Sequence, residues 1–173
     1  MKSNITLIGM PGAGKSTIGI ILAKILSFGF IDTDILIQIN RQNSLQNILD
    51  NQGYLKLREI EEEEIIKINI TKNIIATGGS AVYSNKAMRH LADISSIVFI
   101  DVNFKNIKQR IHNFGSRGIA RNRNQSFLDL FNERQILYNK YSDITINGNC
   151  HDQEELAEII SKKVKSIYKN LIK

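Results

Sequence analysis

The sequence predicts an α/β fold, a doubly wound sheet of five parallel strands with helices on both faces. Two observations support this fold class. Short apolar runs of the kind that form buried parallel strands recur five times along the chain. Longer segments between them carry apolar residues every three or four positions, as one face of a helix does. With 173 residues, 42% of them apolar, the chain fits one domain, 1–173, with an ordinary core.

The first half of the chain begins with an apolar strand at 5–8, a glycine-rich segment at 9–17 and an apolar helical segment at 18–26. A second short strand is expected at 28–31. From 35 to about 54 the pattern is helical but interrupted by polar residues, with Ser44 suited to an N-cap and Gly53 to a helix stop. A further helix is expected from Leu55 through Ile70.

The second half repeats this alternation. Gly78, Gly79 and Ser80 end the third strand in a flexible turn. The polar, basic loop 113–125 lacks apolar periodicity and is a candidate lid. Ser126 is suited to cap a helix that runs to about Tyr141, and Asp152 to open the C-terminal helix. The other expected elements are strands at 73–77, 97–100 and 144–146 and helices at 85–92 and 104–112.

Composition and charge exclude several classes of protein. No segment is long and apolar enough to span a bilayer, and the first strand begins too early to leave room for a signal peptide. The single Cys150 excludes an internal disulfide, so we expect a soluble cytoplasmic protein. The net charge of +6 is concentrated on the last helix, where a solvated face explains it better than a nucleic-acid partner does; the lysines are Lys162, Lys163, Lys165, Lys169 and Lys173. We expect a monomer.

The segment from Gly9 to Thr17 has the spacing G-x-x-x-x-G-K-[ST] of a P-loop, between a strand and a helix. Its glycines let backbone N–H groups turn inward around a polyphosphate, and the helix N-terminus adds partial positive charge. Lys15 is expected to reach the β- and γ-phosphates and Ser16 to hold Mg²⁺. The remaining residues expected to contact the nucleotide here are Gly12, Ala13, Gly14 and Thr17.

Asp32 and Asp34 follow the second strand at its carboxyl end, where parallel α/β sheets bind ligands. A turn that begins after Asp32 would point the two carboxylates in different directions. Asp32 would then hold metal-bound water, while Asp34 orients an acceptor hydroxyl or takes its proton during phosphoryl transfer. The alternative is a purely local role, with Asp34 capping a helix and Asp32 in a turn.

Several arginines are candidates for binding anions. Arg58 and Glu61 are spaced i,i+3 on one expected helix, so the carboxylate can steady the guanidinium. Arg134 lies on a later helix, where an ion pair or partial burial is an equally good explanation. The loop 113–125 contributes Arg117, Arg121 and Arg123, and we expect one of them to close over the phosphates.

Taken together, these segments resemble the shikimate kinase family over nearly the whole chain. The residues that carry the resemblance are 9–17, Asp32-Thr33-Asp34, 57–61, Thr77-Gly78-Gly79, Arg117 and 133–138. The resemblance implies a compact P-loop kinase related in fold to nucleoside monophosphate kinases, with an acceptor-binding segment at about 33–62. It would transfer the γ-phosphoryl group of ATP to the 3-hydroxyl of shikimate in aromatic amino-acid biosynthesis.

The resemblance also implies roles for single residues. Lys15, Asp34 and Arg117 would be catalytic, and Ser16 and Asp32 would hold Mg²⁺. The shikimate carboxylate would lie between Arg58 and Arg134, with Gly78, Gly79 and Ser80 close to the acceptor ring. Arg110 would lie against adenine, and Arg117 would bind the phosphates from the lid.

Three departures from the family pattern concern the acceptor rather than phosphoryl transfer. Ser80 replaces the third glycine of the turn, Gly118 replaces a proline after the lid arginine, and Ile136 replaces a proline in the late helix motif. Two alternatives therefore stay open. One is a kinase of the same fold for gluconate, a nucleoside monophosphate or another hydroxy acid; the other is a nucleotide-binding regulatory or nucleic-acid-associated module.

Overall fold

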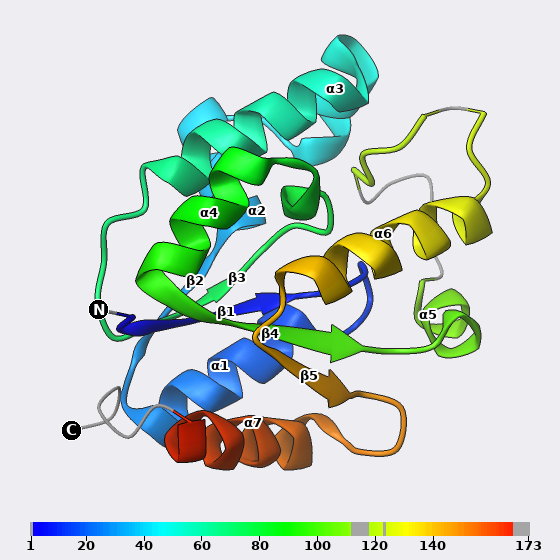
Figure 1. Cartoon of the computed structure of the whole chain (residues 1–173). Helices are drawn as coiled ribbons and strands as arrows, with labels where there is room; N and C mark the ends of the chain where they lie inside the picture. Colours follow the sequence, from blue (N-terminus) through cyan, green and yellow to red (C-terminus); the bar gives the residue numbers. More distant parts are fainter. Residues whose placement is uncertain (1, 112–117, 123, 168–173) are drawn as a thin grey trace.

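The computed structural model describes residues 2–111, 118–122 and 124–167, and it contains the expected five-stranded parallel sheet (Figure 1). The strand order is β2-β3-β1-β4-β5. The predicted strands are confirmed with small differences at their ends. They are β1 (Asn4–Ile8), β2 (Gly29–Asp32), β3 (Asn73–Ala76), β4 (Ser95–Asp101) and β5 (Ile144–Asn147).

The strand order explains where a ligand can bind. The connection after β1 runs to β2 at one edge of the sheet, whereas the connection after β4 runs to β5 at the other edge. The topological switch point therefore lies at the carboxyl ends of β1 and β4, which is where doubly wound sheets leave a crevice for ligands. The glycine-rich loop follows β1 at this point.

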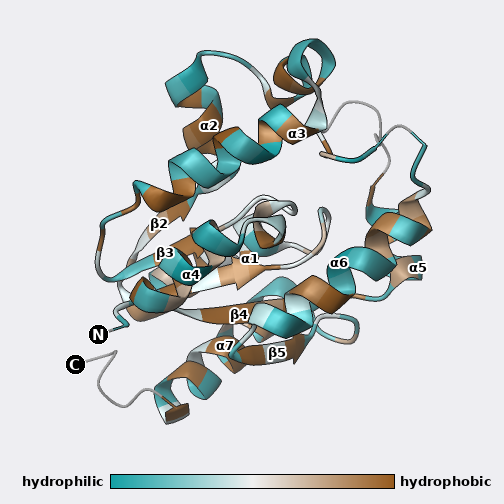
Figure 2. Ribbon diagram, turned by 45° about the horizontal axis from the view of Figure 1, so that its top comes forward, coloured by the Kyte–Doolittle hydropathy of each residue, from teal (hydrophilic) through white to brown (hydrophobic). Residues whose placement is uncertain are grey.

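Helices cover both faces of the sheet. On one face, α1 (Lys15–Leu26) packs against α7 (Gln153–Ile167), and on the other lie α4 (Asn85–Ile94) and α6 (Phe127–Tyr141) (Figure 1). The strands are mostly apolar in their middle parts, with polar residues chiefly at their ends, whereas these helices carry both polar and apolar bands (Figure 2). This pattern is the expected one, because a parallel sheet between two helical layers is buried on both faces. Two short helices also lie in the described chain, the 3₁₀-helix η1 (Ala81–Tyr83) and α5 (Phe104–Arg110).

A second, smaller cluster of buried side chains lies between α2 (Thr33–Arg41) and α3 (Leu45–Ile66). The interrupted helix that we expected from 35 to 54 is in fact two helices. Ser44 caps the second one as predicted, since its hydroxyl accepts from the backbone N–H of Asn47. Ala120 joins this cluster from the distant segment 118–122, and the Gly118 N–H donates to Gln46 Oε1 at 2.8 Å.

Gly53 interrupts α3 without ending it. Its φ of 81° and ψ of 169° are not helical, although helical turns continue on both sides. The sequence therefore indicated both the break at Gly53 and the helix that resumes after it, although this helix ends at Ile66 and not at Ile70. An L-amino acid rarely adopts this backbone conformation, so glycine is required here.

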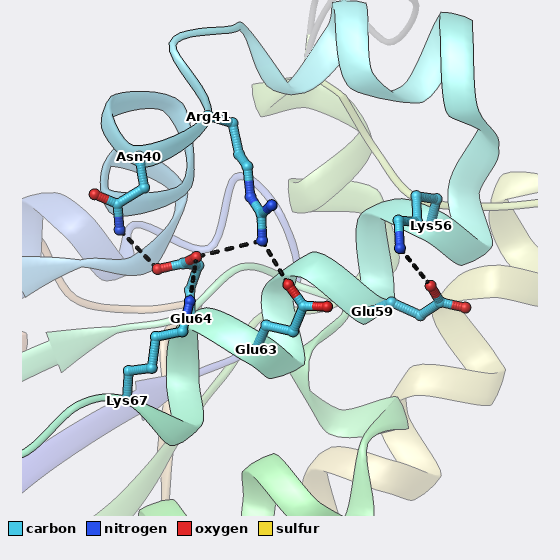
Figure 3. Close-up of polar contacts among 7 residues, drawn as sticks. All are labelled: Asn40, Arg41, Lys56, Glu59, Glu63, Glu64 and Lys67. Atoms are coloured by element: carbon cyan, nitrogen blue, oxygen red, sulfur yellow. Dashed lines mark hydrogen bonds and ion pairs between the residues drawn. The ribbon is translucent and has the colours of Figure 1, made fainter.

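Charged side chains connect α2 to the C-terminal half of α3 (Figure 3). Asn40 Nδ2 donates to Glu64 Oε2 at 2.7 Å, and Arg41 donates to Glu63 at 2.5 Å. Lys67 donates to Glu64 Oε1 at 3.0 Å. Burial alone would raise the pKa of Glu64, but the hydrogen bonds from Lys67 and Asn40 outweigh it and lower the pKa. This network stabilises α2 against α3.

In the part of the chain that the model describes, no helix has both the length and the apolar surface needed to cross a bilayer.

Candidate active site

A cleft of about 550 Å³ lies at the carboxyl ends of β1, β2 and β3. It is lined by the glycine-rich loop, the first turn of α2, the middle of α3, the turn after β3 and the segment 118–120. Most of the residues predicted to form the site line it: Gly12, Gly14, Lys15, Ser16, Thr17, Asp34, Gly78, Gly79, Ser80, Arg110 and Arg134. Segments far apart in the sequence therefore meet at one place.

The loop after β1 has the conformation of a phosphate cradle. Gly12 and Gly14 have φ values of 82° and 97°, in the left-handed region that glycine adopts without strain. Lys15 is buried and donates to the carbonyl oxygens of Gly9 at 2.8 Å and Met10 at 3.0 Å. Burial lowers the pKa of Lys15 to about 8, although the charges of Asp34 and Asp32 oppose this effect. The ammonium group thus lies across the loop, at the place where a polyphosphate would bind.

The two aspartate side chains have different neighbours, as predicted. Asp32 ends β2 and caps α2, because its Oδ1 accepts from the Asp34 N–H at 3.0 Å. Its other oxygen, Oδ2, accepts from Ser16 Oγ at 2.6 Å. A hydroxyl and a carboxylate beside a phosphate cradle are the hard oxygen donors that Mg²⁺ prefers, so the residues present fit a magnesium ion. The helix cap is Asp32 and not Asp34.

Asp34 lines the cleft beside the phosphate cradle. Burial and the charge of Asp32 raise its pKa to about 6, while Lys15 and Arg134 act in the opposite direction. The carboxylate is therefore ionised at neutral pH, yet its pKa lies close enough to neutrality for it to accept a proton.

Glu61 does not steady Arg58 as the i,i+3 spacing suggested. Its side chain turns into the cleft, where Oε2 accepts a hydrogen bond from Ser80 Oγ. Burial, followed by the charge of Asp34, raises the pKa of Glu61 to about 7, against the opposing effects of Ser80, Arg134 and Lys15. The sequence does contain a signal for this placement, because Glu61 falls four residues after the buried Leu57 and therefore on the inward face of α3.

Arg58 and Arg134 converge although they come from α3 and α6. The carbonyl oxygen of Ala120 accepts from Arg134 at 2.8 Å and from Arg58 at 3.4 Å. The guanidinium carbon of Arg58 lies 3.4 Å from the centre of the Tyr83 ring, and that of Arg134 lies 5.5 Å from it. Among the described residues, neither Nε atom has a hydrogen-bond partner, although both are buried. We call these two arginines the clamp.

Arg58 is also half exposed to solvent, and it lines a second, more open depression of about 410 Å³ together with Tyr54 and Glu133. Of the predicted acceptor residues, it is therefore the one that lies beside the main cleft rather than in its lining. Neither Tyr83 nor Ala120 was identified from the sequence. An aromatic ring and a backbone carbonyl carry no motif, so nothing in the sequence marks their contact with the clamp.

The turn after β3 brings backbone close to the charged side chains. An added Cβ on Gly78 would overlap Glu61 Oε1 and would lie 2.5 Å from Asp34 Oδ1. On Gly79 it would lie 2.7 Å from an Arg134 nitrogen. Two supports hold the turn, since the Gly78 N–H donates to Thr33 Oγ1 at 3.0 Å and the Tyr138 hydroxyl donates to the Gly79 carbonyl at 2.8 Å. The glycines are thus needed for this close approach.

The candidate lid is only partly included in the structure. Arg117 and Arg123, both predicted to lie in it, fall outside the described residues. Arg121 donates to the carbonyl of Gln125 at 2.5 Å. Arg110 lines the cleft next to Gly12, on the nucleotide side.

A phosphate cradle after β1, with a carboxylate and paired arginines opposite it, defines a P-loop phosphotransferase with a small-molecule acceptor. Comparison with known proteins identifies the family. The family model described as shikimate kinase matches residues 11–165. A shikimate kinase of Rippkaea orientalis is 38% identical over 162 residues, which cover 91% of this chain and 86% of that protein. The chain belongs to the shikimate kinase family.

Solved structures agree with this assignment. Shikimate kinase from Acinetobacter baumannii, in complex with shikimate, superposes with a TM-score of 0.87 at 27% identity, over 100% of this chain and 97% of the other. Shikimate kinase from Aquifex aeolicus superposes with a TM-score of 0.82 at 28% identity, over 95% and 97%. The protein is accordingly an ATP-using phosphotransferase that acts on an alcohol group.

Proposed function

We propose that the protein transfers the γ-phosphoryl group of ATP to the 3-hydroxyl of shikimate. The family and the related complex with shikimate support this substrate, and the arrangement of the clamp fits a carboxylated polyol. Two guanidinium groups suit a carboxylate, while Asp34 suits a neighbouring hydroxyl. Such a reaction would belong to aromatic amino-acid biosynthesis.

One observation carries the proposal. Arg134 is only 1% exposed, yet its buried Nε has no hydrogen-bond partner among the described residues, and its terminal Nη2 group donates to the neutral carbonyl of Ala120. A buried cation without a full set of partners is costly, so the native protein tolerates it where a ligand supplies the missing anion. The Ala120 oxygen marks a point between the two arginines, and the acceptor carboxylate would bind beside it.

The chain's own residues would perform the transfer mainly by positioning and electrostatics. Lys15 would neutralise charge on the phosphates, with Arg117 assisting from the lid. Asp34 would orient the acceptor hydroxyl and take up its proton as this oxygen bonds to the γ-phosphorus, while the bond from that phosphorus to the β,γ-bridging oxygen breaks and ADP leaves. The clamp would fix the far end of the acceptor, so that the hydroxyl lies in line with the γ-phosphorus.

Mg²⁺ is proposed as the metal ion, held by Ser16 and by water bound to Asp32. When bound, the ion would reduce the negative charge of the phosphate groups. Adenine would lie near Arg110. We further propose that 1–173 is a single kinase domain with an acceptor-binding segment at 33–62 and a lid at 113–125, that it is monomeric, and that it works in the cytoplasm.

The test is a coupled assay of ADP release with shikimate, its methyl ester, gluconate and a nucleoside monophosphate. The ester keeps every hydroxyl but removes the negative charge, so kcat/KM is expected to fall by about a hundredfold or more if the clamp binds the carboxylate. ATP KM should be the same with every acceptor that turns over. A kcat/KM for shikimate no better than that for gluconate or the nucleotide would refute the assignment.

A further inference from the structure

The hydrogen bond between Ser80 and Glu61 lies inside the cleft, and the roles assigned above do not use it. Both residues are nearly buried, at 8% and 3% exposure. Ser80 Oγ donates to Oε2 of Glu61, so the proton of this hydroxyl is directed to the carboxylate and not to an acceptor molecule. Ser80 precedes η1 and Glu61 lies in the middle of α3, so the bond also joins two elements that line the cleft.

The second oxygen of Glu61 is aimed at the reacting region. Oε1 is buried and has no hydrogen-bond partner among the described residues. It lies against Gly78, and Asp34 Oδ1 lies close to the same glycine, since an added Cβ there would overlap Oε1 and come within 2.5 Å of Oδ1. Two carboxylate oxygens, one on α3 and one on α2, therefore face the same stretch of backbone. A polyol with neighbouring hydroxyls could donate to both.

Charged groups from three other helices influence Glu61. Asp34 on α2 disfavours its ionised form, whereas Lys15 at the start of α1 and Arg134 on α6 favour it. Ser80 supplies the only side-chain hydrogen bond to it that the described residues provide, and this bond also favours ionisation. Because burial opposes ionisation, the pKa of Glu61 is raised to about 7. Removing one hydrogen-bond donor would therefore change the charge of Glu61 at physiological pH.

We propose that Ser80 is a positioning residue for the acceptor: by donating to Oε2 of Glu61 it holds Oε1 beside Asp34, where an acceptor hydroxyl can donate to it. This inference rests on the proposed function. It assigns Ser80 a role that acts through Glu61 rather than by direct contact, although the sequence had suggested that Ser80 binds the acceptor itself.

Three substitutions separate the hydroxyl from the rest of the side chain. Ser80→Ala removes only the donor, Ser80→Gly removes the Cβ as well, and Ser80→Thr keeps the donor. The rates of shikimate phosphorylation are measured from pH 5.5 to pH 9 with each variant. Ser80→Ala and Ser80→Gly are expected to raise the shikimate KM at pH 7 by about tenfold, because a hydrogen bond to a charged group is lost.

The same two variants should move the acid limb of kcat/KM upward by about one pH unit, since Glu61 then takes up a proton more readily. ATP KM should stay within about twofold, and Ser80→Thr should restore both the KM and the acid limb. Wild-type acceptor KM and pH profile in Ser80→Ala would overturn the proposal. So would a change confined to Ser80→Gly, because that pattern assigns the effect to the Cβ.

Ser84→Ala is the matched control. Ser84 Oγ donates to Glu62 Oε2 at 2.6 Å, so this pair joins α3 to the start of α4, and neither residue lines the cleft. Because Ser84 also caps α4, its loss should lower the melting temperature without moving the shikimate KM or the acid limb. If Ser84→Ala reproduced the kinetic changes of Ser80→Ala, a general structural effect would explain both, and the positioning role would be wrong.

A measurement without turnover keeps this inference separate from the proposed function. The carboxyl carbon of Glu61 is followed by NMR in ¹³C-labelled protein, with Glu61→Gln used to assign its signal. The midpoint of the Glu61 titration, about 7 in the wild type, should rise in Ser80→Ala and return in Ser80→Thr. Failure of the wild type to phosphorylate shikimate would refute the proposed function alone, whereas an unchanged midpoint would refute the link between Ser80 and Glu61.

Discussion

Arg134 illustrates how single residues define this site. Its side chain is among the largest that the protein buries completely, and the Ala120 carbonyl is its hydrogen-bond acceptor. Arg58 meets it at the same carbonyl and lies over the Tyr83 ring. A planar guanidinium group keeps its N–H donors in a fixed fork when it stacks on an aromatic ring, so the clamp is arranged before a ligand arrives.

We predict that Arg134→Lys and Arg58→Lys each raise the acceptor KM by about tenfold or more while ATP KM is unchanged. Lysine keeps the charge but loses the fork of donors, so the effect measures bidentate binding rather than charge alone. Steady-state kinetics with each substrate varied in turn provide the measurement. Arg41→Ala is the control, because Arg41 binds Glu63 away from the cleft. Unaltered acceptor kinetics in both lysine variants would contradict the clamp.

Glu61 leads to a prediction about stability. Its pKa is raised from 4.5 in the unfolded chain to about 7 in the folded protein. Between these values the native state binds more protons than the unfolded state, so Glu61 makes the free energy of unfolding fall as pH rises. Glu61→Gln should remove this slope and be more stable than wild type above pH 7, by roughly 2 kcal/mol.

Urea unfolding of the substrate-free protein at pH 5 and pH 8 measures this effect. Asp34 contributes a slope of the same sign in both proteins, so the comparison isolates Glu61. Glu63→Gln serves as the control, since the Glu63 side chain is about half exposed and does not line the cleft. The same dependence on pH in wild type and Glu61→Gln would show that Glu61 is not the residue that binds the proton.

The sequence predicted residues whose role depends on a local motif. The spacing of the glycine-rich loop fixes Lys15 and Ser16, and a strand that ends at a helix cap fixes the divergence of Asp32 and Asp34. Contacts between distant segments could not be predicted in this way. The spacing of Arg58 and Glu61 is compatible with an ion pair, but Glu61 lies on the buried face of α3 and finds Ser80 there instead.

At the level of elements, the strands and the later helices were predicted most accurately. Ser126 caps α6 and the helix ends at Tyr141, as expected, because a polar cap and an apolar stripe mark both ends. The region of α2 and α3 was predicted least accurately. Its polar interruptions do not distinguish a loop at Gln42 and Asn43 from a break inside a helix, and the packing of both helices on one small cluster decides between them.

Gly53 provides a test at this scale. An alanine Cβ would meet no atom within 4 Å, so any loss of stability in Gly53→Ala must come from the backbone conformation alone. We expect the free energy of unfolding to fall by about 1–3 kcal/mol. Chemical denaturation gives the value, and Gln52→Ala at the neighbouring exposed position should change it by less than about 0.5 kcal/mol. A variant as stable as the wild type would mean that α3 becomes a regular helix.

At the level of the whole molecule, the basic residues of α7 lie outside the lining of the cleft. Lys162, Lys163 and Lys165 are exposed on α7, and Lys162 pairs with Glu158 at 3.5 Å on the same helix. Helix α7 packs against α1 on the face of the sheet opposite α4 and α6, as Figure 1 shows. These three lysines are exposed, as expected from the sequence, whereas Lys169 and Lys173 lie outside the described residues.

We therefore predict that replacing these three lysines together by glutamine leaves kcat/KM for both substrates within about twofold of wild type. The coupled assay at low and moderate ionic strength measures this. A large loss of activity, or tight binding of nucleic acid that disappears in the variant, would instead favour the nucleotide-binding module that the sequence had left open.

The segment 118–120 connects the two halves of the cleft. This segment lines the main cleft. Its Gly118 is hydrogen-bonded to Gln46 on α3. Its Ala120 packs between α2 and α3, and the Ala120 carbonyl accepts hydrogen bonds from both clamp arginines. A substrate that moves this segment therefore changes the environment that the other substrate meets. Thermodynamic reciprocity then requires that, if shikimate tightens nucleotide binding by some factor, the nucleotide tightens shikimate binding by the same factor.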